Sequence, residues 1–190
     1  MDRRRLGFVL IAVGLVEVIG TAWAFAARPG SRSIPALWAP LGAIRGGPTC
    51  DVPAFSGQTV DVVLSDSGGM MGGGMMPGGR MMGISTTPSV VGVGTVSFRV
   101  WNAGMMVHEL VVLPLPAGGA GTRPVEADGR VSEEGSLGEA SSSCGEGPGD
   151  GIAPGAASWV SLELAPRRYE LICNLPGHYA MGMFTELDVG

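Results

Sequence analysis

The chain has 190 residues, a length that favours one domain with room for a tail or an anchor. Its 33 glycines and 14 prolines predict many turns, which suits a small all-β domain better than a helical one. The formal charge is -5, and no basic run follows residue 5. Nucleic acid is therefore excluded as a partner, because binding phosphates requires clustered cations.

The N-terminal part carries an export signal. Three arginines precede an apolar run over residues 6–27, interrupted only by Glu17 and a few small residues. About 20 such residues cross a bilayer as a helix, and the arginines predict that everything beyond them is exported. Residues 1–27 are therefore expected to be a membrane anchor or a signal segment, in an extracytoplasmic protein. An uncleaved anchor is favoured, although Ala24-Phe25-Ala26 also resembles a signal peptidase site, whose cleavage would make the protein secreted.

Export changes what the three cysteines mean. Outside the cytoplasm Cys50 and Cys144 are able to form a disulfide, worth about 4–5 kcal/mol in the chain-entropy model. Cys173 is then a free thiol that needs another explanation. Residues 28–56, rich in proline, glycine and arginine at their start, are expected to be a tether to a domain over residues 57–190.

The domain is expected to be built from short strands. In residues 95–101, apolar Val96, Phe98 and Val100 alternate with polar neighbours, the pattern of a half-buried strand. Runs of strand character with turn signals between them indicate a β-sandwich or barrel. The seven runs are residues 59–65, 89–91, 95–101, 108–113, 157–164, 168–173 and 183–189.

Two segments interrupt this pattern. Residues 67–83 form a loop rich in methionine and glycine, and residues 116–156 form a glycine-rich, acidic insertion that is too long for an ordinary connection. The acidic residues of the insertion favour a solvated surface, with a docking patch for a basic partner as the alternative. These residues are Glu133, Glu134, Glu139 and Glu146.

The residues with the clearest chemistry lie near the C-terminus. Cys173, His178 and Met183 are five positions apart, and His108 begins a distant strand. A thiolate, two imidazoles and a weak axial thioether are the ligands of trigonal copper sites that exchange electrons. Structural zinc normally takes four strong ligands, and a Cys–His nucleophile would leave Met183 unexplained. A buried thiol with two hydrogen-bonded histidines is the remaining alternative; the joint pattern favours a metal.

The pattern Cys173-x4-His178-x4-Met183, with His108 upstream, resembles the cupredoxins, the small blue copper proteins that include plastocyanin and azurin. Its loop spacing is similar to that of rusticyanin and the sulfocyanins. The resemblance implies a Greek-key β-sandwich, here with an N-terminal hydrophobic helix. It also implies one type 1 copper ion with His108, Cys173 and His178 as equatorial ligands. Met183 is the preferred axial ligand, and Met181 competes for that place.

The function implied by the resemblance is transfer of single electrons between redox proteins, such as components of a respiratory chain. No second histidine cluster exists to build a catalytic copper, so the protein is expected to be a carrier and not an enzyme. A non-redox binding module is a further alternative.

The methionine-rich loop suggests a rival function, which is copper capture or delivery. Residues 59–65 and 95–101 are expected to run in the same direction, so the loop should emerge beside the copper site. Thioethers are soft ligands that select Cu(I), and they also make adaptable docking surfaces. A loop that merely covers apolar surface is the third interpretation. The methionines concerned are Met70, Met71, Met75, Met76, Met81 and Met82.

Overall fold

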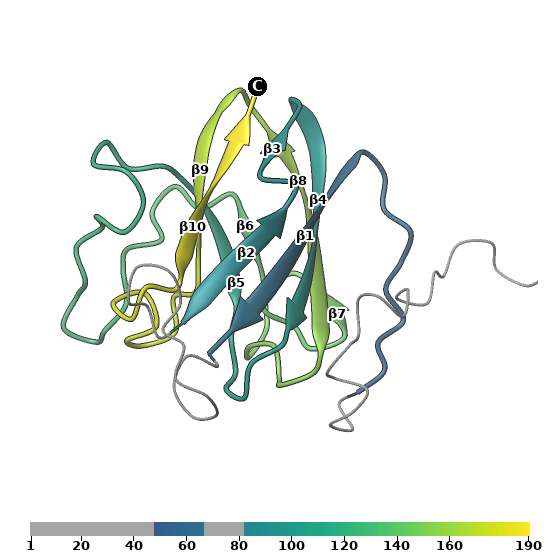
Figure 1. Cartoon of the computed structure of the whole chain (residues 1–190), viewed down its shortest axis with the longest axis horizontal. Coiled ribbons are helices and arrows are strands. Elements are labelled where there is room, and N and C mark those ends of the chain that lie inside the picture. Colours follow the sequence, from purple (N-terminus) through teal and green to yellow (C-terminus); the bar gives the residue numbers. More distant parts are fainter. Residues whose placement is uncertain (1–47, 67–81) are drawn as a thin grey trace, which may run out of the picture.

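The computed structural model describes residues 48–66 and 82–190 (Figure 1). The expected anchor over residues 6–27 and most of the methionine-rich loop lie outside these ranges. The described residues form ten strands and no helix, so none of them belongs to a helix able to cross a bilayer. The all-β fold predicted from the sequence is confirmed.

The first sheet has the strand order β2-β1-β4-β8-β7. β1 and β4 are parallel, paired from Gln58 with Val96 to Leu64 with Asn102. β8 is antiparallel to β4, and β2 is antiparallel to β1. The strand bounds are Gln58–Ser65 for β1, Gly83–Thr87 for β2, Gly94–Asn102 for β4, Gly145–Glu146 for β7 and Ala157–Leu164 for β8.

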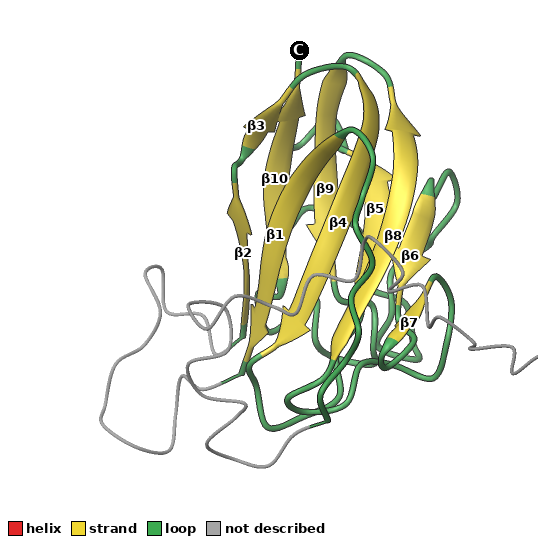
Figure 2. Cartoon of the chain, turned by 90° about the vertical axis from the view of Figure 1, so that its right-hand side faces the viewer, coloured by secondary structure: helices red, strands yellow, loops and turns green. Residues whose placement is uncertain are grey.

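The second sheet has the order β3-β10-β9-β5-β6 and packs face to face on the first, as Figure 2 shows. β9 is antiparallel to both of its neighbours, β10 and β5. The two sheets together make a β-sandwich. The strand bounds are Val90–Val91 for β3, Leu110–Pro114 for β5, Gly138–Ala140 for β6, Arg167–Ile172 for β9 and Phe184–Val189 for β10.

The core lies between the two sheets. The strand β4 is more buried than the predicted half-buried strand, because Ser97 and Trp101 are also buried. Its apolar residues Val96, Phe98 and Val100 are completely buried. They pack in one cluster with apolar side chains of both sheets, including Leu110 and Leu171 of the second. The period-2 pattern of β4 therefore places one face of that strand against the core.

Strand direction brings distant residues to one end of the sandwich, the lower end in Figure 1. β4 ends at Asn102 and β9 ends at Ile172, immediately before Cys173. Ile172 is paired with Val111 at the start of β5 and with Phe184 at the start of β10. The β4–β5 and β9–β10 connections, which carry all the expected copper ligands, therefore meet at this end.

The seven predicted runs correspond to β1, β3, β4, β5, β8, β9 and β10. The run that begins at His108 starts later than predicted, because β5 begins at Leu110 and His108 forms an isolated bridge with Ile152. β2, β6 and β7 were not predicted. They are short, and their sequences lack a regular alternation of apolar and polar residues.

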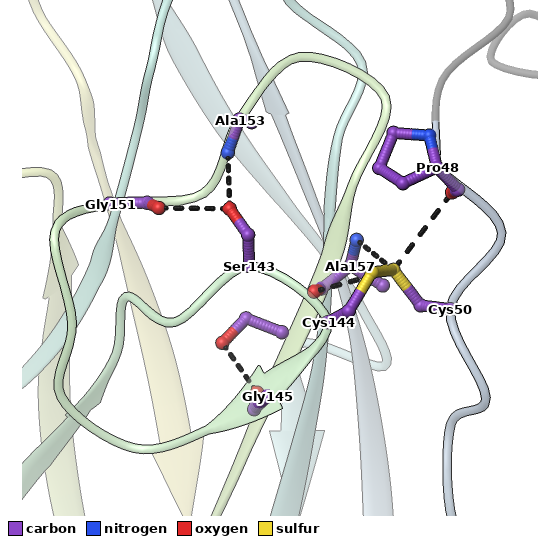
Figure 3. Close-up of a disulfide and its surroundings, with 9 residues drawn as sticks. Pro48, Cys50, Ser143, Cys144, Gly145, Gly151, Ala153 and Ala157 are labelled. Atoms are coloured by element: carbon purple, nitrogen blue, oxygen red, sulfur yellow. Dashed lines mark hydrogen bonds between the residues drawn. A yellow bond between two sulfur atoms is a disulfide. The ribbon is translucent and has the colours of Figure 1, made fainter.

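A disulfide joins Cys50 to Cys144, the pairing considered from the sequence (Figure 3). Ala157 lies between the two cysteines at the start of β8. Its N–H donates to Cys50 Sγ at 3.3 Å, and its carbonyl accepts from Cys144 N at 2.7 Å. The disulfide thus attaches the N-terminal segment to the edge of the first sheet.

Candidate metal centre

Three side chains form a compact cluster at the lower end of the sandwich. Cys173 Sγ and the Nδ1 atoms of His108 and His178 all lie within 4.8 Å of one another. The two Nδ1 atoms are 3.3 Å apart, and Cys173 Sγ is 3.3 Å from His178 Nδ1 and 4.0 Å from His108 Nδ1. All three residues are buried.

The backbone holds the ligand-bearing segments in place. His108 and Ile152 exchange two hydrogen bonds, with His108 N donating at 3.2 Å and Ile152 N at 2.7 Å. In the β9–β10 loop, Met183 N donates to the carbonyl of His178 and Cys173 N donates to that of Met183, both at 3.1 Å. The loop is therefore closed by its own hydrogen bonds, and it places Met183 beside Cys173.

Met183 is the methionine that joins the cluster. It is completely buried and packs in the same core cluster as Cys173, whereas Met181 remains partly exposed. Together with His108 and His178, these residues cluster as in a type 1 copper site. Because Met181 packs against the same core cluster, the choice of Met183 as the axial ligand stays a prediction.

The dimensions of the cluster fit a metal ion. A triangle with sides of 3.3, 3.3 and 4.0 Å has a circumradius of about 2.1 Å, so one point lies that far from all three ligand atoms. Zinc, an ion similar in size to copper, forms bonds of about 2.0–2.3 Å to nitrogen and sulfur ligands. Among the described residues, no aspartate or glutamate joins the cluster. A fourth strong ligand for tetrahedral zinc is therefore missing there, and the soft donor set favours copper.

Burial keeps the three ligands neutral in the metal-free protein. Desolvation lowers the pKa of both His108 and His178, and the neighbouring His178 further lowers that of His108. Desolvation also raises the pKa of the Cys173 thiol to about 12. The imidazoles are thus ready to bind a metal, while the thiol must first lose its proton.

Backbone and side-chain groups that sequence reasoning missed surround Cys173. Glu109 N donates to Cys173 Sγ at 3.4 Å, and Glu109 Oε1 accepts from Asn174 N at 3.1 Å. The Asn174 side chain in turn exchanges two hydrogen bonds with the backbone of Val131, at 2.8 and 2.9 Å. No sequence pattern predicts these contacts, because Val131 belongs to the acidic insertion, far from Cys173 in the chain.

The acidic insertion contacts the copper-ligand loop directly. Glu133 Oε1 accepts from Asn174 Nδ2 at 2.7 Å, so its carboxylate is not simply solvated, although the residue is exposed. Glu134 and Glu146 are exposed, and Glu139 is partly exposed, in agreement with an acidic surface.

A buried ionic network secures the same loop from another side. Glu170 is completely buried in β9, and its carboxylate accepts from Arg123 Nε at 2.6 Å and from the Tyr179 hydroxyl at 2.8 Å. Tyr179 follows the ligand His178 directly. The network therefore links the insertion to the residue next to a copper ligand.

Asp66, the last described residue before the methionine-rich loop, lies beside the site. β1 and β4 run in the same direction, as predicted, and Asp66 at the end of β1 accepts hydrogen bonds from the backbone of Met105 and Met106. Met82 is 4% exposed and packs in the core, so its side chain is not on the surface. The other candidate residues for a second Cu(I) or docking site, Met70, Met71, Met75, Met76 and Met81, lie outside the described residues.

No protein-family profile matches the chain, and no curated protein does. Among solved structures it is similar to auracyanin A, a "blue" copper protein from Chloroflexus aurantiacus (17% identity, 70% of this chain and 99% of that chain, TM-score 0.43). It is also similar to an auracyanin from Roseiflexus castenholzii (13% identity, 72% and 99%, TM-score 0.46). A third similar structure is rusticyanin from Thiobacillus ferrooxidans (21% identity, 78% and 90%, TM-score 0.40).

The described residues form a β-sandwich that buries a His-Cys-His-Met cluster at one end. The four residues cluster as in a type 1 copper site, as the sequence motif predicts. The cofactor that the four residues fit is one type 1 copper ion.

Proposed function

We propose that the protein carries single electrons between redox partners, with His108, Cys173 and His178 as equatorial ligands of one copper ion and Met183 as the axial ligand. The observation that carries this proposal is the buried triangle of two Nδ1 atoms and one thiol sulfur, whose dimensions fit a metal ion. When bound in such a set, copper exchanges one electron between its Cu(II) and Cu(I) states.

The surrounding protein limits how far the ligands move. His108 is held by its paired hydrogen bonds to Ile152, and the loop that carries His178 is closed by hydrogen bonds onto Cys173 and Met183. Burial excludes water from the ligand atoms. A site that keeps nearly the same geometry in both oxidation states makes electron exchange easier, since little reorganisation is needed.

The surface next to the site suits transient contact with another protein. Met105, Met106 and Val107, which precede His108, are 61%, 47% and 40% exposed. Apolar, unbranched thioethers adapt to varied partner surfaces. We propose redox proteins as partners, among them respiratory-chain components, and a carrier role without catalysis.

The disulfide supports an extracytoplasmic location, because such bonds persist mainly in oxidising compartments. We propose that residues 6–27 anchor the protein to a membrane. Fractionation of cells that express the full chain tests this location. Release of the protein by high salt, without detergent, would contradict the anchor.

The direct test of electron transfer adds Cu(II) to the metal-free protein and records visible absorption and electron paramagnetic resonance. We expect an intense thiolate-to-copper band with small hyperfine splitting, and loss of both in Cys173→Ser. A weak Cu(II) signal that is indifferent to Cys173 would refute the proposal.

Copper capture or delivery is the second candidate function. It is favoured by the position of Asp66, which is the last described residue before the methionine-rich loop and lies next to His108. Deleting residues 70–81 tests it while leaving Met82 in the core. Loss of Cu(I) affinity with an intact blue site would support delivery. Unchanged copper loading with slower electron exchange would support docking.

A further inference from the structure

Asp66 is a buried carboxylate directly after β1. Its side chain is 4% exposed, and both of its oxygens accept hydrogen bonds. Met105 N donates to Oδ1 and Oδ2 at 2.9 Å each, and Met106 N donates to Oδ2 at 2.6 Å. Asp66 therefore ties the end of β1 to the segment just ahead of His108.

The same carboxylate faces the ring of His108. His108 Nε2 lies 3.4 Å from Asp66 Oδ2 and is buried, and Asp66 Oδ2 is the acceptor that faces it, although no hydrogen bond of Nε2 is aligned in the described chain. The opposite ring nitrogen, Nδ1, faces Cys173 and His178. The imidazole thus stands between the metal cluster on one side and a negative charge on the other.

Gly104 leaves the space for this contact. A Cβ atom at residue 104 would lie 2.9 Å from Asp66 Cγ and 2.9 Å from His108 Nε2. Such distances are too short for ordinary contact, so any larger residue would displace the carboxylate or the imidazole. The close approach of Asp66 to His108 therefore depends on a glycine at this position.

We propose that Asp66 is a positioning residue of the copper site, which holds the proton of His108 on Nε2 and favours Cu(II) over Cu(I) by its negative charge. This inference rests on the proposed function. A partner on the outer nitrogen of a ligating histidine fixes its tautomer and ring orientation, and raises its basicity. A nearby anion also stabilises the more highly charged ion, more strongly in a buried site than in water.

The test compares Asp66→Asn with wild type in the full chain. Asp188→Asn is the matched control, because Asp188 is exposed near the end of β10 and its loss makes the same change in charge. We expect Asp66→Asn to weaken Cu(II) binding by about 10- to 100-fold, the usual range for outer-sphere partners, and to weaken Cu(I) binding less. The reduction potential should therefore rise, by 59 mV for each tenfold change in the affinity ratio. A potential equal to that of the control would overturn the inference.

Gly104→Ala provides a second variant that keeps the charge. It should also weaken Cu(II) binding, because the added methyl group separates the carboxylate from the imidazole. Unchanged affinity in Gly104→Ala would contradict the positioning role. This variant keeps the inference testable if Asp66→Asn does not fold.

Nitrogen-15 NMR of the metal-free protein separates this inference from the proposed function. We expect the His108 proton on Nε2 in wild type, and a changed tautomer balance in Asp66→Asn. A wild-type protein without a blue band would refute the electron-transfer function alone. A His108 proton on Nδ1 in metal-free wild type would overturn the role of Asp66 whatever the absorption spectrum shows.

Discussion

Glu109 makes the stability of the metal-free protein depend on pH. The residue is 7% exposed, and burial raises the pKa of its carboxyl from the ordinary 4.5 to about 7, with a further rise from the charge of Glu139. The folded protein therefore keeps this proton up to about pH 7, whereas the unfolded chain releases it near pH 4.5. The stability that Glu109 contributes is fully present below pH 4.5 and is lost as the pH rises through about 7. A shift of this size corresponds to about 3 kcal/mol.

Glu109→Gln isolates this effect, because the amide stays neutral and keeps an oxygen to accept from Asn174 N. Urea unfolding of metal-free wild type and variant should give similar free energies of unfolding near pH 4.5. At pH 8 the variant should be about 3 kcal/mol more stable. Glu134→Gln, at an exposed position of the insertion, is the control and should show little change with pH. A wild-type–variant difference that is the same at both pH values would refute the reasoning.

Three further predictions concern other parts of the molecule. Arg123→Ala should destabilise the protein by about 2–4 kcal/mol in urea unfolding, because it leaves the buried carboxylate of Glu170 without its cation. The double variant Arg123→Ala, Glu170→Gln should recover much of this lost stability. Copper uptake near pH 7.5 should release about one proton, since Cys173 is protonated and both histidines are neutral. Calorimetry in two buffers measures this release, and uptake without proton release would contradict the prediction. Replacing Cys50 and Cys144 by alanine should cost about 2–5 kcal/mol of stability, and an unchanged urea midpoint would argue against the disulfide.

The sequence was sufficient to select the residues that cluster and to predict most strands, because both signals are local. Cys173, His178 and Met183 lie within eleven residues, and soft side chains at that spacing are uncommon enough to stand out. The strand β4 was similarly predictable, since apolar Val96, Phe98 and Val100 alternate with Ser97 and Arg99 in the sequence. Short polar strands carry no such pattern. Gly83–Thr87, for example, is identified as a strand only by its pairing with β1.

The outer contacts of the site could not be predicted, because their partners are far apart in the chain. Asp66 is 39 residues from Met105, and Arg123 is 47 residues from Glu170. From its neighbours in sequence alone, either Asp66 or Arg123 would be interpreted as a solvated surface residue. The fold gives these residues their roles by burying them against a specific partner.

The acidic insertion then has a structural role that its composition does not suggest. Gly177, directly before His178, donates its N–H to the carbonyl of Gly129 at 2.8 Å, and a Cβ at residue 129 would lie only 3.0 Å from Gly177 N. Asn174, directly after Cys173, is hydrogen-bonded to Val131 of the insertion. The segment between Cys173 and His178 is therefore attached to the insertion at both of its ends. His108 is held by Ile152, which also belongs to the insertion, and it faces Asp66. Each half of the ligand set is thus fixed by chain segments that supply no ligand. The rigidity that the proposed electron exchange requires therefore depends on residues outside the Cys-His-Met motif.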